Sequence, residues 1–142
     1  MVQRMVGWPI LVLLAFGGSC SSSRSAPQAG TAATWSLASD SLSTDATSFV
    51  AGVVRLACSG GSTGDVGSPT IERQRGAIVI TFAALPLDPN MDYPCPANDT
   101  VSVRVDLGEA IGTRQLIDGG CRAYPVARAT AMCAADGVRW SP

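Results

Sequence analysis

Hydrophobic and polar side chains alternate regularly over residues 101–107. The apolar positions are Val101, Val103, Val105 and Leu107, and the polar positions between them are Ser102, Arg104 and Asp106. A period of two predicts a half-buried β-strand with one face in water. Segments 49–58 and 77–85 are apolar at both parities and rich in Val and Ile, which favours strands buried on both faces. A short buried helix gives a similar run, so both interpretations stay open for these two segments.

Shorter runs with strand character occupy residues 34–38, 70–74, 113–117 and 138–140. Turn-forming clusters of Gly, Pro, Asp and Ser separate the runs, at 59–65, 75–76, 87–90 and 118–120. The Ala-rich segment 127–135 predicts one short helix. Many short strands divided by turns, with little helix, predict an all-β fold, namely a small disulfide-linked β-sandwich of about the size of an immunoglobulin domain.

The N-terminal segment is apolar for a different reason. A short basic region with Arg4 precedes an apolar run over residues 5–16, and the small residues Gly17, Gly18 and Ser19 follow it. These are the three parts of a secretory signal. The run is shorter than the roughly 20 apolar residues that cross a bilayer, and it contains Pro9, so we predict an export signal and not a transmembrane anchor.

Cys20 directly follows these small residues. The segment resembles the bacterial lipoprotein signal, in which small residues precede a Cys that is diacylated on sulfur and becomes the mature N-terminus. Gly18 and Ser19 match that pattern, whereas Gly17 stands where Leu is usual. The resemblance implies lipidation of Cys20. The alternative is ordinary signal cleavage nearby, which would leave Cys20 as an odd thiol.

Three regions follow from these patterns: a signal peptide at 1–19, a lipidated Cys and flexible tether at 20–33, and one β-rich domain at 34–142. From Cys20 onward the chain has nine Arg and eleven acidic residues, with no basic run. This charge balance does not favour nucleic acid as a partner. The expected partners are the membrane, through the lipid anchor, and an envelope component or protein ligand.

The chain has five Cys, and lipidation of Cys20 would leave an even set of four, which suits two disulfides in an oxidising compartment. Four Cys allow three pairings, and sequence alone does not choose among them. We favour Cys58–Cys95, which would cross-link two adjacent strand regions, and Cys121–Cys133, which would close a short loop. A metal or redox site is disfavoured because the chain has no Cys-x-x-Cys motif and no His.

Nucleophilic catalysis has few candidate residues here. The chain contains neither His nor Lys, which excludes a His-dependent triad, a Ser–Lys mechanism and a Schiff base. We predict no enzyme, no catalytic residue, no metal and no cofactor. The alternative is a small carboxylate-dependent hydrolase acting on envelope glycans through a pair such as Asp106 and Glu109, although these acids equally suit Arg partners. An ion pair between Arg114 and Asp118 is also expected.

Oxygen ligands are concentrated in the segment 88–92, where Asp88, Asn90 and Asp92 lie two residues apart. This spacing is typical of the first half of a calcium loop, but Tyr93 occupies the position where the sharp turn of such a loop needs Gly. We therefore expect a surface turn.

Four parts of the mature chain carry a recognisable pattern: Trp35-Ser36-Leu37, segments 54–61 and 93–98, and segment 105–119. In the last of these, a strand that includes Leu107 is followed by the turn Ile111-Gly112 with Arg114 and by the turn Asp118-Gly119. With these residues, much of the mature chain resembles a group of actinobacterial secreted lipoproteins, whose recurrent element is a strand, a leucine-glycine turn with an Arg and an Asp-Gly turn. Ala110 stands where Pro is frequent in the group. The resemblance implies an envelope location and no established activity. We expect a membrane-tethered lipoprotein on the extracytoplasmic face, or alternatively a secreted protein, with a non-enzymatic binding or structural β domain.

Overall fold

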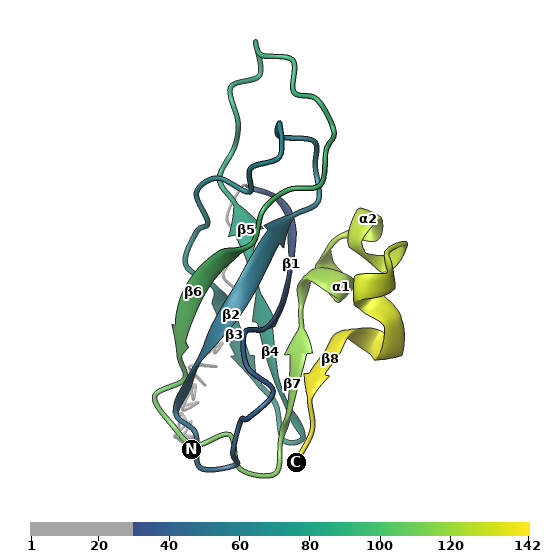
Figure 1. The fold of residues 1–142 in the computed structure, drawn as a ribbon. Helices are drawn as coiled ribbons and strands as arrows, with labels where there is room; N and C mark the ends of the chain where they lie inside the picture. Colours follow the sequence, from purple (N-terminus) through teal and green to yellow (C-terminus); the bar gives the residue numbers. More distant parts are fainter. Residues whose placement is uncertain (1–29) are drawn as a thin grey trace, which may run out of the picture.

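The computed structural model describes residues 30–142 (Figure 1). The expected signal peptide and Cys20 lie outside the described residues. Eight strands form two four-stranded sheets, and three short helical segments lie between the last two strands. The predicted all-β, disulfide-linked fold is confirmed. Among the residues described, none of the helices has the length and apolar character needed to cross a membrane.

The first sheet has the strand order β5-β1-β2-β6, and all its pairs are antiparallel. Its members are β1 (Thr31–Leu37), β2 (Ser48–Arg55), β5 (Ala83–Ala84) and β6 (Val101–Asp106). The alternation predicted for residues 101–107 is confirmed, because Ser102, Arg104 and Asp106 are exposed and Val105 is buried. The open choice for 49–58 is resolved as strand β2.

The second sheet has the order β3-β4-β7-β8, in which β4 and β7 run parallel and the other pairs are antiparallel. Its members are β3 (Thr70–Arg73), β4 (Ala77–Thr81), β7 (Gln115–Asp118) and β8 (Val138–Trp140). Segment 77–85 therefore forms β4 and β5. β4 is buried on both faces, since Ile78 and Ile80 face the main core while Ala77 and Val79 belong to a smaller cluster with Ile117.

The main core lies between the two sheets, and Trp35 is its largest fully buried side chain. The ring of Trp35 packs on Phe49 with centroids 5.4 Å apart. Its indole Nε1 donates a hydrogen bond of 3.0 Å to the carbonyl oxygen of Ile80 in the other sheet. A buried indole needs such an acceptor, so this residue joins the two sheets by packing and by a polar contact.

β1 begins at Thr31, so the strand includes residues assigned to the tether from sequence. Thr31 and Ala32 pair with β5, and Ala33 is fully buried. Because these positions carry only small side chains, they show no hydrophobic alternation. Pairing with a distant strand makes them part of the domain.

The single helix predicted at 127–135 is wrong. The structure has α1 (Gly120–Ala123), α2 (Pro125–Arg128) and the 3₁₀ segment η1 (Ala131–Gly137). Thr130 is extended between α2 and η1, with φ −96° and ψ 155°. Its hydroxyl bonds back to the carbonyl oxygen of Ala127 at 2.7 Å, a local contact by which Thr competes with helix continuation.

Candidate functional site

Both disulfides join the pairs that the sequence favoured, Cys58–Cys95 and Cys121–Cys133. The first cross-links two long loops at one end of the sandwich, which we call the loop end, and both of its Cys residues are exposed. The second lies among the helical segments α1, α2 and η1, which together form the flank of the domain, and Cys121 is buried there (Figure 1). Two disulfides indicate an oxidising, extracytoplasmic environment.

Asp118 is the last residue of β7, and its side chain fixes the junction between β7 and α1. Its carboxylate is fully buried and accepts hydrogen bonds from three donors: the amide of Trp35 at 3.1 Å, the amide of Gly120 at 2.8 Å, and the guanidinium of Arg139 at 2.7 Å. Burial raises the pKa of Asp118, while these donors oppose that rise. The carboxylate therefore joins β1, α1 and β8 at one point.

The ion pair expected between Arg114 and Asp118 is wrong. Arg114 instead bonds Glu109 at 2.9 Å and the carbonyl oxygen of Ile111 at 2.8 Å. The partner of Asp118 is Arg139, which lies 21 positions later in the sequence, on β8. Closeness in sequence misled the prediction because the extended strand β7 separates the two residues, and four residues of strand span about 13 Å.

Gly119 and Gly120 let α1 start directly against the sheets. A Cβ on Gly119 would lie 1.9 Å from the hydroxyl oxygen of Thr81, and one on Gly120 would lie 2.4 Å from the carbonyl oxygen of Ala33. Both distances are too short for a side chain. The Asp-Gly-Gly sequence thus makes a close junction that places Cys121 and Arg122 on the flank.

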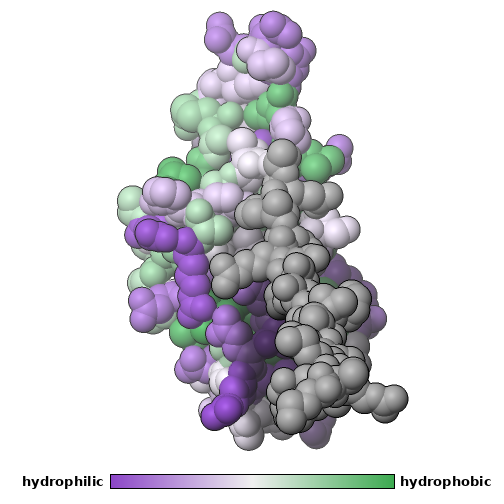
Figure 2. All heavy atoms as spheres, turned by 180° about the vertical axis from the view of Figure 1, so that it is seen from behind, coloured by the Kyte–Doolittle hydropathy of each residue, from purple (hydrophilic) through white to green (hydrophobic). Residues whose placement is uncertain are grey.

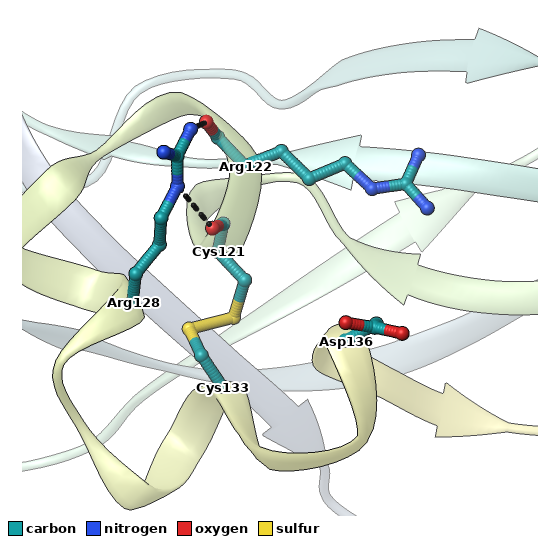
Figure 3. A pocket seen from close by; sticks show the side chains of 5 residues that line it. All are labelled: Cys121, Arg122, Arg128, Cys133 and Asp136. Carbon is teal, nitrogen blue, oxygen red and sulfur yellow. Dashed lines mark hydrogen bonds between the residues drawn. A yellow bond between two sulfur atoms is a disulfide. The ribbon is translucent and has the colours of Figure 1, made fainter.

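A pocket of about 560 Å³ opens on this flank (Figure 3). It is lined by Cys121, Arg122, Arg128, Cys133 and Asp136. The disulfide lies between Arg128 and Asp136, and the side chain of Arg122 extends past the disulfide to the side on which Asp136 lies. Two cationic groups and one anionic group therefore surround one covalent link.

The two Arg side chains of the pocket differ in how they are held. Arg128 donates from Nε to the carbonyl oxygen of Cys121 at 3.2 Å and from Nη2 to the carbonyl oxygen of Arg122. These bonds leave its Nη1 without a partner among the residues described. The guanidinium of Arg122 is exposed and, within residues 30–142, makes neither an ion pair nor a hydrogen bond.

Asp136 is presented by a strained turn. Ala135, Asp136 and Gly137 have φ values of 51°, 55° and 74°. Side chains other than Gly adopt this left-handed region at a cost of order 1 kcal/mol or more, unless the surroundings hold them there. The surroundings here are tight, since a Cβ on Gly137 would lie 2.9 Å from the sulfur of Cys121. Nothing in residues 30–142 pairs with the Asp136 carboxylate.

Asp106 and Glu109, the acids weighed for hydrolysis, serve local contacts. Glu109 accepts hydrogen bonds from Arg114 at 2.9 Å and from Arg73 at 3.0 Å, and chiefly the Arg114 bond lowers its pKa. A carboxyl group held ionised in this way is a poor proton donor. Asp106 accepts from the amide of Gly108 at 2.9 Å, which closes the turn after β6.

The segment 88–92 forms a surface turn, as expected. Asp88 accepts hydrogen bonds from the amide of Asn90 at 2.9 Å and from its side-chain nitrogen at 3.0 Å. In the part of the chain that the structure describes, no group of three or more His, Cys, Asp or Glu side chains is placed to hold a metal ion.

Sequence reasoning did not single out Arg122, Arg128 or Asp136. The one available signal was the expected Cys121–Cys133 bond, because residues between and beside bonded Cys must come together. No protein-family model, curated protein or solved structure matches the chain. The geometry of the pocket is therefore the main guide to function.

Proposed function

We propose that the protein is a lipid-anchored, extracytoplasmic binding domain with a non-enzymatic role, and that its ligand site is the pocket formed by Arg122, Arg128 and Asp136. The observation that carries the proposal is a pocket of about 560 Å³ that is lined by charged side chains of both signs, none of which forms an ion pair with another described residue. Small-molecule sites commonly measure about 300–1,000 Å³, so the pocket suits a small ligand or the end of a larger one.

The cationic groups of the pocket determine what can enter. A guanidinium offers five N–H donors in a planar fork and pairs well with carboxylate or phosphate oxygens. Arg122 has all of its donors available among the described residues, and Arg128 is already positioned by two carbonyl oxygens. Positioning before binding reduces the entropy lost on binding, which supports a ligand with at least one anionic group.

A binding role fits the pocket better than hydrolysis does. Glycoside hydrolysis by carboxyl groups needs two acids that face each other, about 5–9.5 Å apart. Among the described residues, the pocket lining contains one carboxylate, Asp136, and Glu109 forms hydrogen bonds with two Arg side chains elsewhere.

A broad apolar docking face is less well supported than the pocket. Within residues 30–142, the large exposed hydrophobic side chains lie in three separate parts of the chain: Val50 on β2, Leu85 and Met91 in a long loop, and Val126 on α2. Figure 2 shows hydrophilic residues over the outermost part of the loop end, and the exposed residues there include Asp88, Asn90 and Asp92.

The proposed anchor is compatible with access to the pocket. Residues 20–30 would reach about 40 Å at full extension, so an acylated Cys20 would keep the domain near the membrane surface. Each buried methylene of an acyl chain contributes about 0.8 kcal/mol, and two or three chains give durable attachment. β1 enters the sandwich beside β5, whereas the pocket is formed by α1, α2 and η1 on the flank (Figure 1).

Anchoring is tested by Cys20→Ser, with Ser21→Ala as the matched control. We expect the Cys20→Ser protein in the soluble fraction and the control in the membrane fraction, with an acylated N-terminal Cys in its intact mass. Equal membrane retention of both proteins after removal of the signal would contradict lipid anchoring through Cys20.

Binding at the pocket is tested by NMR titration of the exported protein with small carboxylates and inorganic phosphate. We expect the amide signals of Arg122, Asp136 and Gly137 to shift, and the shifts to weaken in Arg122→Gln. Arg75→Gln, in the exposed turn before β4, is the matched control and should behave like the parent. Shifts that spread over the surface and respond equally to both substitutions would count against a pocket site.

A further inference from the structure

We infer that the ligand of the pocket is a zwitterion: a small molecule or peptide end that carries a carboxylate for Arg122, in a pocket to which Arg128 adds positive charge, and an ammonium group for Asp136. The inference rests on the proposed function, because it names the ligand class of the same site. It uses the charges of both signs that line the pocket around the Cys121–Cys133 disulfide (Figure 3).

The carboxylate half follows from the donors that remain. Arg128 uses Nε and Nη2 on backbone carbonyl oxygens, which leaves Nη1 available, and Arg122 contributes a complete guanidinium fork. A carboxylate has two oxygens, so it can accept two parallel hydrogen bonds from the fork of Arg122, while Arg128 adds positive charge to the pocket.

The ammonium half follows from Asp136. Its carboxylate oxygens accept no hydrogen bond within residues 30–142, although the backbone holds this residue in the left-handed region with φ 55°. An ammonium group has three donors and the opposite charge. The disulfide at Cys133 and the packing of Gly137 on Cys121 keep the turn in place, so Asp136 stays at the pocket without a ligand.

The combination selects against ligands of a single charge. A dianion would place negative charge beside Asp136, and a dication would place positive charge beside Arg122 and Arg128. A direct ion pair between Arg122 and Asp136 across the open pocket would contribute little because both groups are exposed. A ligand with both charges can replace that contact and form two better hydrogen-bonded ones.

The test uses alanyl-alanine as the probe, in three forms: both ends free, N-acetylated, and C-amidated. The exported full-length protein is titrated by NMR, and dissociation constants are taken from the signals of Arg122, Asp136 and Gly137. Loss of one charged contact should weaken binding about tenfold, so each blocked peptide should bind about tenfold more weakly than the free dipeptide.

Two variants assign each end of the peptide to its side chain. In Asp136→Asn, the free and N-acetylated peptides should bind within about twofold of each other, while the effect of C-amidation persists. In Arg122→Gln, the effect of C-amidation should shrink, while the effect of N-acetylation persists. Asn tolerates left-handed backbone, so Asp136→Asn should keep the parent fold and melting temperature. Asp92→Asn and Arg75→Gln are the matched controls.

The outcomes separate this inference from the proposed function. If N-acetylation leaves binding at the pocket unchanged in the parent protein, the zwitterion assignment is overturned while the pocket remains a binding site. If the dipeptides shift no pocket signal but carboxylates or phosphate do, the assignment fails in the same way. If no probe moves the pocket signals, both conclusions fail.

Discussion

The loop end and the flank of the domain each contain one buried charged side chain, and the two side chains have different kinds of partner. At the loop end, the buried guanidinium of Arg55 donates to the carbonyl oxygens of Thr63 at 3.0 Å and Leu85 at 2.6 Å, and to the hydroxyl of Thr31. No carboxylate pairs with it among residues 30–142. On the flank, the buried Asp118 has a charged partner, Arg139, in addition to two backbone amides.

The difference follows from the chemistry of the two groups. A guanidinium spreads one charge over five donors, so two neutral carbonyl oxygens and one hydroxyl from three segments can satisfy it. A carboxylate concentrates its charge on two oxygens, and its burial is costly without a counter-charge. Arg55 therefore ties together β1 and two loops that have little regular structure of their own. Asp118 instead fixes a compact junction from which the pocket is built.

The loop end should depend most on its covalent link. Replacing Cys58 and Cys95 by Ser should lower the free energy of unfolding by about 4 kcal/mol, because the bond closes a loop with a sequence separation of 37 residues. Urea denaturation monitored by fluorescence measures the change. Binding of the free dipeptide at the flank should be retained, and its loss would show that the two regions are coupled.

The flank disulfide should matter less for stability and more for binding. Replacing Cys121 and Cys133 by Ser should cost about 3 kcal/mol, since the separation is 12 residues. The same variant should lose binding of the free dipeptide in the NMR titration, because nothing covalent then holds Asp136 opposite Arg122. Unchanged binding would mean that Gly137 and Arg128 suffice to shape the pocket.

Removing the buried carboxylate tests the flank junction itself. Asp118→Ala should lower the free energy of unfolding by about 3 kcal/mol, because it leaves two buried amides and Arg139 without their acceptor. Asp92→Ala, on the exposed loop, is the control and should change the free energy by less than about 0.5 kcal/mol. Equal small effects of both substitutions in denaturant melts would contradict the junction role.

The buried cation should be easier to replace. Arg55→Met keeps much of the side-chain volume and leaves only neutral acceptors unpaired, while it removes the cost of burying a charge. Burial lowers the pKa of Arg55, which reflects that cost. We expect a loss of about 1–2 kcal/mol in the same denaturant experiment, less than for Asp118→Ala. A larger loss than at Asp118 would reverse the comparison between the two regions.

The smallest effect concerns pH. Burial raises the pKa of Asp118 above its ordinary value of 3.8, so the folded protein holds this proton more tightly than the unfolded chain does. The contribution of Asp118 to stability should therefore rise as pH falls from 7 toward 4. Glu109 should act oppositely, because its lowered pKa gives stability above pH 4.5 that is lost on further acidification.

Denaturant melts of the parent, Asp118→Ala and Glu109→Gln between pH 3 and 7 measure these contributions. The difference in the free energy of unfolding between the parent and Asp118→Ala should grow as the pH falls through this range. The difference between the parent and Glu109→Gln should shrink once the pH falls below 4.5, the ordinary pKa of Glu109. A flat difference for Asp118 across the range would contradict the raised pKa.

Local patterns were sufficient for the strands. The period-two alternation at 101–107 became β6, and the apolar segments 49–58 and 77–85 became strands of the two sheets. The helix at 127–135 failed because Ala content records only intrinsic propensity. Thr130 is extended and Ala135 is left-handed, so the Ala-rich segment does not continue as one helix.

The sequence by itself determined the all-β class, the positions of most strands and the set of four Cys from which the disulfides form. These properties follow from side-chain alternation, turn residues and Cys number, all of which are local or countable. The tertiary structure alone decided that Arg139 pairs with Asp118, that Arg55 is buried, and that Arg122, Arg128 and Asp136 surround one pocket. Contacts between distant charges depend on burial and on the exact path of the chain, and neither is encoded in a periodic pattern.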